Sequence, residues 1–276
     1  MLKLNSEIKK VTPKKFDRSK ASVAYQKTIL VNQLDEAFKR FDGPFIFEYE
    51  SKKSDFGWHP SGDCLPRVSV LWANAYSALH PDESVAVRKD LRHLNKIFMV
   101  GHYWHQIIQH IIVKEGWAQE SSIESVGYRL WDNEGLSTTY WRPTNTPHDD
   151  PEDLRAFHYV RGQGDVAPLV MPTWNGLVDI KTMNADDFKR GLSQSRFANK
   201  YLAQINIYMD LFDLDQAMIL AVDKGSSAFA EYTFVRDQKL IDQIYAKWQR
   251  VGTLLDNNQK PTPEDDEAFA LYIGDE

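Results

Sequence analysis

Cysteine is nearly absent from this sequence. Cys64 is the single cysteine among 276 residues, so no disulfide can form within the chain. Proteins that fold in oxidising compartments usually contain several cysteines, whereas a lone thiol is typical of a reducing cytosol. The cysteine content therefore predicts a cytoplasmic protein without a disulfide framework.

Long apolar runs are also missing. The longest, such as residues 107–113, are interrupted and far shorter than the roughly 20 residues that a transmembrane helix needs. The first residues are rich in lysine, but the apolar segment of a signal peptide does not follow them. We therefore expect neither a membrane span nor a secretory leader.

Basic residues are in deficit, since the formal net charge is −6 at pH 7. Residues 1–20 nevertheless hold seven basic and two acidic side chains, whereas residues 256–276 hold seven acidic and one basic. An acidic total does not exclude a local basic groove for a polyanion. The basic N-terminus is either an arm that contacts such a partner or a solvated end.

The residues that are present predict a mixed fold. Hydrophobic residues make up 42% of the chain and aromatic residues 12%, which is enough for a sizeable core. Apolar periodicity and the Gly and Pro positions predict helices at about 20–41, 66–79, 83–115, 185–192, 196–212 and 237–255, and Asp237 is predicted to cap the last of them. Strands are predicted at about 123–131, 156–163, 165–170, 177–182, 216–222 and 228–235. This order is that of an α/β (mixed α+β) fold, in which helices flank a central mixed sheet.

The predicted elements divide the chain into three parts. Residues 1–18 form a flexible basic arm, 19–255 one domain, and 256–276 an acidic tail. Within the domain, 19–116 is the helical N-terminal part and 117–255 the core with the sheet. Gly101 is a candidate break in the long helix of the N-terminal part.

The most informative pattern is an acidic residue followed, one strand later, by Asp-x-Lys. In the later strand Asp179 and Lys181 share one face, while Val178 and Ile180 occupy the other. Asp165 is the earlier acid. Two carboxylates can hold Mg²⁺ against a phosphate, and a lysine beside them can activate water and offset developing charge. The pattern favours metal-dependent phosphodiester hydrolysis, and an ordinary surface ion pair is the competing interpretation.

A hairpin would bring these groups together. An Asn-Gly turn signal predicts a loop over 171–176. In that register Val170 pairs with Leu177, and Asp165 lies beside Lys181 at one end of the hairpin. The acid of one strand and the acid and lysine of the next would then converge.

The helix predicted at 196–212 adds a third element. Gln204 and Tyr208 are one turn apart, so they project from one face. An apolar stripe lies beside them, formed by Leu202, Ile205, Met209 and Phe212. The pair either faces the acidic residues or caps the edge of the core.

Taken in order, these segments resemble the PD-(D/E)XK nuclease superfamily, and within it the RecB-type, phage and CRISPR-associated exonucleases. The matching segments are Gly164-Asp165, Val178-Asp179-Ile180-Lys181-Thr182, and Gln204 with Tyr208. A Gly-x-x-x-His pattern ending at His105 and a Ser-x-x-Cys-x-x-Arg pattern ending at Arg67 fit the same branch. The resemblance covers about residues 60–235, and the order of its patterns is more specific than any one of them.

The resemblance implies a restriction-endonuclease-like core and a metal site. His105, Asp165 and Asp179 would bind Mg²⁺ or Mn²⁺, and the carbonyl of Ile180 would complete the inner shell. Glu124, which stands before the strand segment at 126–131, is an additional candidate acid.

The resemblance also implies roles around the substrate. Lys181 would be the catalytic lysine, and Gln204 and Tyr208 would orient the DNA backbone or Lys181. Arg67 would hold a phosphate or, equally, a structural carboxylate partner. Trp131, Trp141 and Trp174 fall in or near predicted loops around the sheet, and they either stack on bases or have core or loop-pinning roles, of which we favour the latter two.

The chain departs from this branch in its cysteines. Several relatives hold an iron–sulfur cluster with four cysteines, and a cluster of this kind needs thiolates that this sequence does not contain. We therefore expect no iron–sulfur cluster. Cys64 is expected to pack as a small buried apolar residue.

The activity that the resemblance implies is that of a metal-dependent DNA exonuclease, of phage type, in DNA recombination, replication or repair. Two alternatives stay open: a structure-specific endonuclease on the same core, and a non-catalytic DNA-binding or assembly module. The expected partners are DNA and, as a candidate, a recombination or single-strand-binding protein. The expected location is the host cytoplasm if a phage encodes the chain.

Overall fold

The structure, a computed structural model, describes residues 29–40, 56–81, 95–132, 135–142, 155–193 and 196–271. The basic arm predicted over 1–18 lies outside these residues. The helices are α1 Val31–Lys39, α2 Pro60–Asp63, α3 Val68–Leu79, α4 Asn95–Lys114, α5 Ala185–Ser193, α6 Arg196–Leu211, α7 Gln238–Asp256 and α8 Pro263–Ala268. The strands are β1 Ile123–Asp132, β2 Gly135–Arg142, β3 Tyr159–Met171, β4 Trp174–Met183, β5 Gln216–Asp223 and β6 Phe229–Val235.

The strands form one mixed sheet of six, in the order β2-β1-β3-β4-β5-β6. Neighbouring strands are antiparallel except β4 and β5, which run parallel. A parallel pair needs a crossover between its strands, and here the connection carries α5 and α6. The predicted mixed α/β fold with helices around a central mixed sheet is therefore confirmed, and the arrangement is consistent with a restriction-endonuclease-like core.

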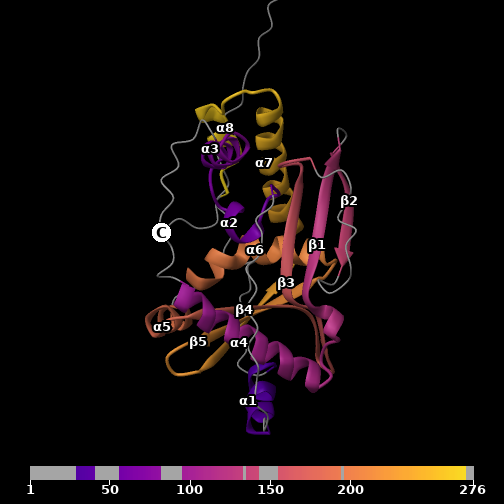
Figure 1. Cartoon of the computed structure of the whole chain (residues 1–276), viewed down its shortest axis with the longest axis vertical. Helices are drawn as coiled ribbons and strands as arrows, with labels where there is room; N and C mark the ends of the chain where they lie inside the picture. Colours follow the sequence, from indigo (N-terminus) through magenta and orange to yellow (C-terminus); the bar gives the residue numbers. More distant parts are fainter. Residues whose placement is uncertain are drawn as a thin grey trace, which may run out of the picture.

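Two hydrophobic clusters cover the two faces of the sheet. One packs α6, α7 and α3 against residues such as Leu177 and Ile219, and the other packs α4 and α1 against residues such as Val178 and Ile180. Figure 1 shows α3, α7 and α8 gathered at one end of the molecule and α1 and α4 at the other. The predicted alternation of β4 is confirmed, because its apolar odd and even residues pack into different clusters.

Helix α4 passes through Gly101 without a break. A Cβ atom on Gly101 would lie 3.0 Å from the Thr182 hydroxyl oxygen, which is tighter than ordinary packing. The glycine therefore serves the close approach of α4 to β4, and the predicted break is wrong. The first part of the predicted helix, residues 83–94, lies outside the described residues.

The strand prediction missed β2 and split β3 in two. Residues 156–163 and 165–170 belong to a single strand, Tyr159–Met171. Trp131 and Trp174 lie in strands and are buried, with 8% and 6% of their surface exposed. Both therefore pack in the core, which is one of the roles predicted for them. Trp141 lies in β2.

The acidic C-terminal segment is folded over its described part. Helix α8 begins with a capping box in which Thr262 and Asp265 exchange hydrogen bonds. Arg250 of α7 donates to Asp265 at 2.8 Å. Ser69 of α3 donates to Asp266 from its backbone N–H at 2.8 Å and from its hydroxyl at 2.7 Å. These contacts dock the segment between α3 and α7.

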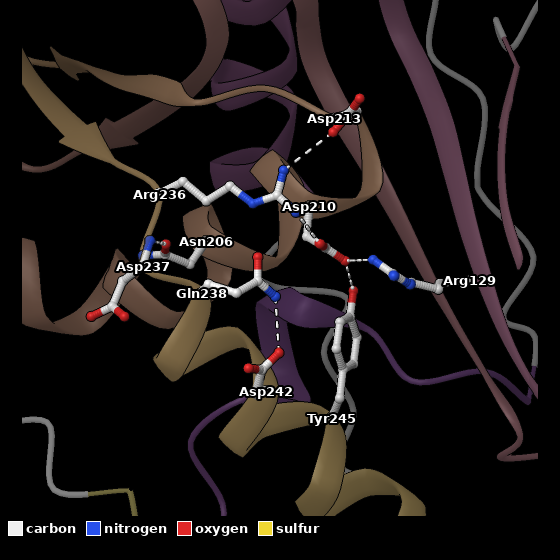
Figure 2. Close-up of polar contacts among 9 residues, drawn as sticks. All are labelled: Arg129, Asn206, Asp210, Asp213, Arg236, Asp237, Gln238, Asp242 and Tyr245. Atoms are coloured by element: carbon white, nitrogen blue, oxygen red, sulfur yellow. Dashed lines mark hydrogen bonds and ion pairs between the residues drawn. The ribbon is translucent and has the colours of Figure 1, made fainter. Parts of the chain in front are cut away.

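Helix α6 is tied to the rest of the fold by a buried polar network around Asp210 (Figure 2). The Asp210 carboxylate accepts hydrogen bonds from Arg236 at 2.5 Å and from Tyr245 of α7 at 2.7 Å. Arg129 of β1 donates to the same carboxylate. Removing one partner from a buried ionic group costs several kcal/mol, because the remaining charge is left without compensation. The network therefore holds α6 in one orientation.

Two further features belong to the same corner of the fold. Asn206 lies one turn before Asp210 on α6 and accepts the backbone N–H of Asp237 at 2.6 Å. The Asp237 side chain in turn accepts the N–H of Leu240 at 3.2 Å, which confirms the predicted N-cap of α7.

In the described part of the chain no helix is long and apolar enough to cross a bilayer.

Candidate active site

The candidate site lies where β3 and β4 separate. Backbone pairing between them starts at Val166 and Val178, and beyond that point β3 continues beside β1 while β4 continues beside β5. Asp165 stands at this fork, and its Oδ2 accepts the backbone N–H of Ile180 at 2.6 Å. The carboxylate thus supplies the acceptor that a neighbouring strand would otherwise offer. This places an acid of β3 directly against the Asp-x-Lys segment of β4.

The register of this hairpin differs from the prediction. Val170 pairs with Asn175, not with Leu177, and the strands are closed by a turn at residues 172–173. Pro172 has no backbone N–H to give to a ladder and suits a turn position. The acid therefore reaches the N–H of Ile180 rather than lying beside Lys181.

The Asn-Gly signal has another cause. Gly176 lies inside β4, and a Cβ atom there would come within 2.4 Å of the carbonyl oxygen of Gln216. Only glycine permits this approach of β4 to the start of β5. The dipeptide therefore marks strand packing rather than a turn.

Asp179 and Lys181 form a buried ion pair on the α6 face of β4. Lys181 Nζ donates to Asp179 Oδ1 at 3.0 Å and lies 2.8 Å from Oδ2. The Asp179 side chain is 4% exposed and that of Lys181 20% exposed. The ring of Tyr201 lies under the ammonium group, with Nζ 5.2 Å from the ring centre. The ion pair of the competing interpretation exists, but it is buried and adjoins another acid.

Helix α4 contributes two polar side chains to this cluster. His105 Nδ1 lies 3.3 Å from Asp165 Oδ1. Gln109, one turn further along α4, donates to the backbone carbonyl of Asp165 at 3.0 Å. The row Gly101, His105 and Gln109 therefore faces the fork. This arrangement brings His105 to the acid with which the sequence patterns group it.

The charges of the cluster shift one another's pKa values. Burial opposes ionisation of Asp165, yet the nearby His105, Lys181 and the Ile180 N–H together lower its pKa. Burial raises the pKa of Asp179, and the Lys181 ammonium only partly offsets this. Burial would lower the pKa of His105, but the Asp165 carboxylate outweighs it and raises that pKa. The acid at the fork is thus held ionised, whereas its neighbour on β4 holds a proton more readily.

Helix α6 places Gln204 and Tyr208 against the same cluster. Gln204 Nε2 donates to the Tyr208 hydroxyl at 3.1 Å, and both side chains are buried. Burial raises the pKa of Tyr208, and the Lys181 ammonium counteracts part of this rise. Tyr208 also lines a cavity together with Asp165. The predicted face of α6 therefore meets the acidic residues.

The donor set suits a divalent cation of the hard type. It contains two carboxylates, an imidazole and the carbonyl of Ile180, and oxygen donors with one imidazole are the ligands that Mg²⁺ and Mn²⁺ accept. Asp179 Oδ2 is buried and lies 2.8 Å from the Lys181 ammonium nitrogen. Within the described residues, however, no three His, Cys, Asp or Glu side chains are gathered tightly enough for a metal ion. The chemical types of the donor groups therefore suit Mg²⁺ or Mn²⁺, while the Asp179 carboxylate is turned towards Lys181.

Arg67 is not among the residues that line the cavity beside Asp165. It is exposed at the N-terminus of α3. Cys64 is 2% exposed, and burial raises the pKa of its thiol, so its predicted packing as a small buried residue is confirmed.

Two residues of α7 that the sequence did not single out hold the segment between α2 and α3. Lys247, 1% exposed, donates to the carbonyl oxygens of Cys64 and, at 3.0 Å, of Pro66. Trp248 Nε1 donates to the carbonyl of Asp63 at 2.9 Å. Nothing local in the sequence signals these contacts, because they join residues about 180 positions apart.

We expect Lys247 to make stability depend on alkaline pH. Burial lowers its pKa from the model-compound value of 10.5 to about 8. Between these values the unfolded chain binds a proton that the folded chain has released, so the free energy of unfolding rises with pH. The full contribution is roughly 3 kcal/mol, from about 1.4 kcal/mol per pKa unit. Denaturant unfolding at pH 7.5 and 9.5 should show this rise for the native chain relative to Lys247→Met, and parallel pH profiles would contradict it.

The cavity beside Asp165 adds residues that the sequence patterns did not include. It has a volume of about 210 Å³ and is lined by residues 59–61 of the α2 segment, Arg161 and Gln163 of β3, and Tyr208. Period-2 alternation back from Asp165 would have found Gln163 and Arg161, because all three share one face of β3. Glu124, the additional candidate acid, accepts a hydrogen bond at 3.1 Å from Gln163, which lines this cavity, but Glu124 is not among the lining residues.

The comparisons with known proteins found similarity to solved structures. No family model matches the chain, and no curated protein matches it. A crystal structure of a protein designated SSO0001 has 13% identity and a TM-score of 0.42, over 83% of this chain and 88% of that one. An alkaline exonuclease from Laribacter hongkongensis, LHK-Exo, has 13% identity and a TM-score of 0.42, over 74% of this chain and 89% of that one.

Proposed function

We propose that this protein is a metal-dependent deoxyribonuclease that hydrolyses phosphodiester bonds. The observation that carries the proposal is the fork of β3 and β4, where Asp165 meets the buried Asp179–Lys181 pair. Charged groups are costly to bury, and a cluster with opposed pKa shifts beside a polar cavity is typical of a catalytic site. A purely structural ion pair would need neither the second acid nor His105.

Asp165, Asp179 and His105, with the carbonyl of Ile180, are the residues that would hold Mg²⁺ or Mn²⁺. A bound divalent cation would supply charge that stabilises the reacting phosphate and lowers the pKa of a coordinated water. Without it, the two carboxylates repel a phosphate. The protein's own contribution is to fix both carboxylates on adjacent strands.

Lys181 is suited to act on the reacting phosphate. Its ammonium group is held by Asp179 and by the face of Tyr201, so it is ordered before a substrate binds. Although burial disfavours its charge, the adjacent Asp179 carboxylate raises the pKa of Lys181. Lys181 therefore remains a cation at neutral pH and offsets negative charge that develops on the phosphate.

Tyr208 is proposed to position the reacting groups. Tyr208→Phe removes the hydroxyl that accepts the hydrogen bond from Gln204 and borders the cavity. We expect the turnover rate to fall by about 100-fold, since a displacement of about 1 Å can cost that much. The dependence of rate on metal concentration should stay unchanged. Steady-state cleavage at several metal concentrations measures both, and an altered metal optimum would contradict a purely positioning role.

Exonuclease action is the form of the activity that we propose, with endonuclease action on the same core as the alternative. The test is digestion of end-labelled linear DNA with Mg²⁺ or Mn²⁺, with and without EDTA. Release of label with a divalent ion and none with EDTA supports a metal-dependent nuclease. Cleavage of closed circular DNA would overturn exonuclease action, and binding without any cleavage would favour a non-catalytic DNA-binding module. The same proposal includes that the protein is a phage-type enzyme that acts in DNA recombination, replication or repair.

A further inference from the structure

The cavity beside Asp165 has a cationic wall that the motif residues do not explain. Arg161 lies four residues before Asp165 on the same face of β3, and both line the cavity. Residues 59–61, which include the hydroxyl of Ser61, also line the cavity. At about 210 Å³ the cavity is smaller than typical small-molecule sites of about 300–1,000 Å³, so it suits a backbone segment of a longer chain.

We infer that this cavity is a phosphate subsite. In it, Arg161 binds a phosphodiester group of the cleaved DNA strand that is not the phosphodiester group being hydrolysed. The inference rests on the proposed nuclease function and identifies where the uncleaved part of the strand is held. It also moves the substrate contact predicted for Arg67 to a residue of the sheet.

The surroundings of Arg161 orient its guanidinium group. Arg161 Nε donates to the Tyr128 hydroxyl at 3.1 Å, and the guanidinium carbon lies 5.9 Å from the centre of the Tyr128 ring. Tyr128 is itself buried in β1. A planar guanidinium whose orientation is fixed loses little freedom on binding, and its geometry matches two oxygens of one phosphate.

The spacing along β3 separates Arg161 from the chemistry. Four residues at about 3.3 Å each place its Cα roughly 13 Å from that of Asp165. Successive nucleotides rise by about 3.4 Å along one strand of B-DNA, so Arg161 meets a different phosphate from the one at the acids. Its contact is therefore the same before and during the reaction, and such contacts change the affinity rather than the turnover rate.

The charge balance gives the subsite its importance. The chain carries a net charge of −6, and the acid Asp165 lines the same cavity. A phosphodiester group that binds in this cavity therefore needs a compensating cation from the protein. Arg161 supplies that cation on the same strand, and Gln163 between them is held by Glu124 at 3.1 Å.

The test compares three variants in DNA binding and cleavage. Arg161→Gln removes the positive charge, and Arg161→Lys keeps the charge but not the planar guanidinium group. Arg155→Gln is the matched control. Arg155 pairs with Asp256 at 2.5 Å, its side chain is 58% exposed, and it lies outside the cavity. Binding of a fluorescent DNA oligonucleotide is measured in EDTA at several salt concentrations, and KM and kcat are measured with Mg²⁺ or Mn²⁺. Thermal unfolding confirms that each variant is folded.

We expect Arg161→Gln to weaken DNA binding by about 10- to 100-fold and to reduce the salt slope of log affinity by about 1. KM should rise while kcat changes little, Arg161→Lys should lie in between, and Arg155→Gln should match the native chain.

Native-like affinity and salt slope in a folded Arg161→Gln variant of a chain that does cut DNA would overturn the subsite alone. A fall in kcat with unchanged binding would also overturn it, because Arg161 would then act in the reaction. A native chain that neither binds nor cuts DNA would instead overturn the proposed function, and the subsite with it.

Discussion

Replacing Asp179 by asparagine is expected to abolish nuclease activity while leaving the chain folded. The change keeps the shape of the side chain but removes the negative charge, so the site loses one of two carboxylates that can hold a divalent cation. Asp179 Oδ2, the oxygen that lies 2.8 Å from Lys181 Nζ, becomes either a neutral carbonyl oxygen or an amide nitrogen. We expect cleavage of end-labelled DNA to fall by several orders of magnitude with both Mg²⁺ and Mn²⁺.

The fold should survive because the group left behind is not fully enclosed. Lys181 loses its anionic partner, but its side chain is 20% exposed and can turn towards solvent. Asp213→Asn is the matched control, since the Asp213 side chain is 97% exposed and its pair with Arg236 is a surface contact. Far-ultraviolet circular dichroism and thermal unfolding should be close to those of the native chain for both variants. Full activity of Asp179→Asn with Mn²⁺ would refute the assigned site.

The parts of the fold that follow from local patterns were predictable. The alternation of β4 and the Asp237 cap of α7 each depend on a few neighbouring residues, and both were found. Strand β2 was missed although Thr138, Thr139 and Tyr140 favour strands. Trp141, which belongs to the same strand, was placed in or near a loop.

The hairpin register was not predictable from the turn signal alone. The Asn-Gly dipeptide carries the strongest hairpin signal in the segment. Gly176 is nevertheless used for the approach of β4 to Gln216 of β5, a contact across 40 residues of sequence that no local pattern reveals. The error moved Asp165 along β4, from the N–H of Ile180 to the side of Lys181. The convergence of the acids survived this error because both registers place Asp165 near the end of the same strand.

The residues that support the site were beyond reach of the sequence for a related reason. Asp210 holds α6 through partners on β1 and α7. Lys247 holds the segment between α2 and α3 through two backbone carbonyls. Such contacts depend on how distant elements pack, and a lone Asp or Lys on a helix predicts only a solvated face. Figure 2 shows Asp210 contacted by Arg129 of β1, by Tyr245 of α7 and by Arg236, which follows β6. The catalytic candidates were found because they occur in an ordered series, whereas their supports occur singly.

Lys181→Ala is expected to reduce turnover by several orders of magnitude and to weaken DNA binding far less. The ammonium group sits between Asp179 and the ring of Tyr201, where it can act only on a phosphate placed at the acids. Preorganised charge at the reacting atoms lowers the barrier in the transition state more than it strengthens the ground-state complex. One such donor is commonly worth about 100- to 1,000-fold in kcat.

The experiment must separate the charge of Lys181 from its packing. Lys181→Met keeps most of the side-chain volume, so it should restore the stability lost in Lys181→Ala without restoring activity. Single-turnover cleavage at saturating enzyme measures the rate of the bound complex, and binding in EDTA measures affinity for the ground state. Arg161→Gln should show the opposite pattern, with weak binding and a near-native bound rate, because it contacts a phosphate away from the acids. If Lys181→Met bound DNA poorly but cleaved the bound strand at the native rate, Lys181 would be an anchor for the strand, and the charge that stabilises the reacting phosphate would have to come from the metal ion and His105.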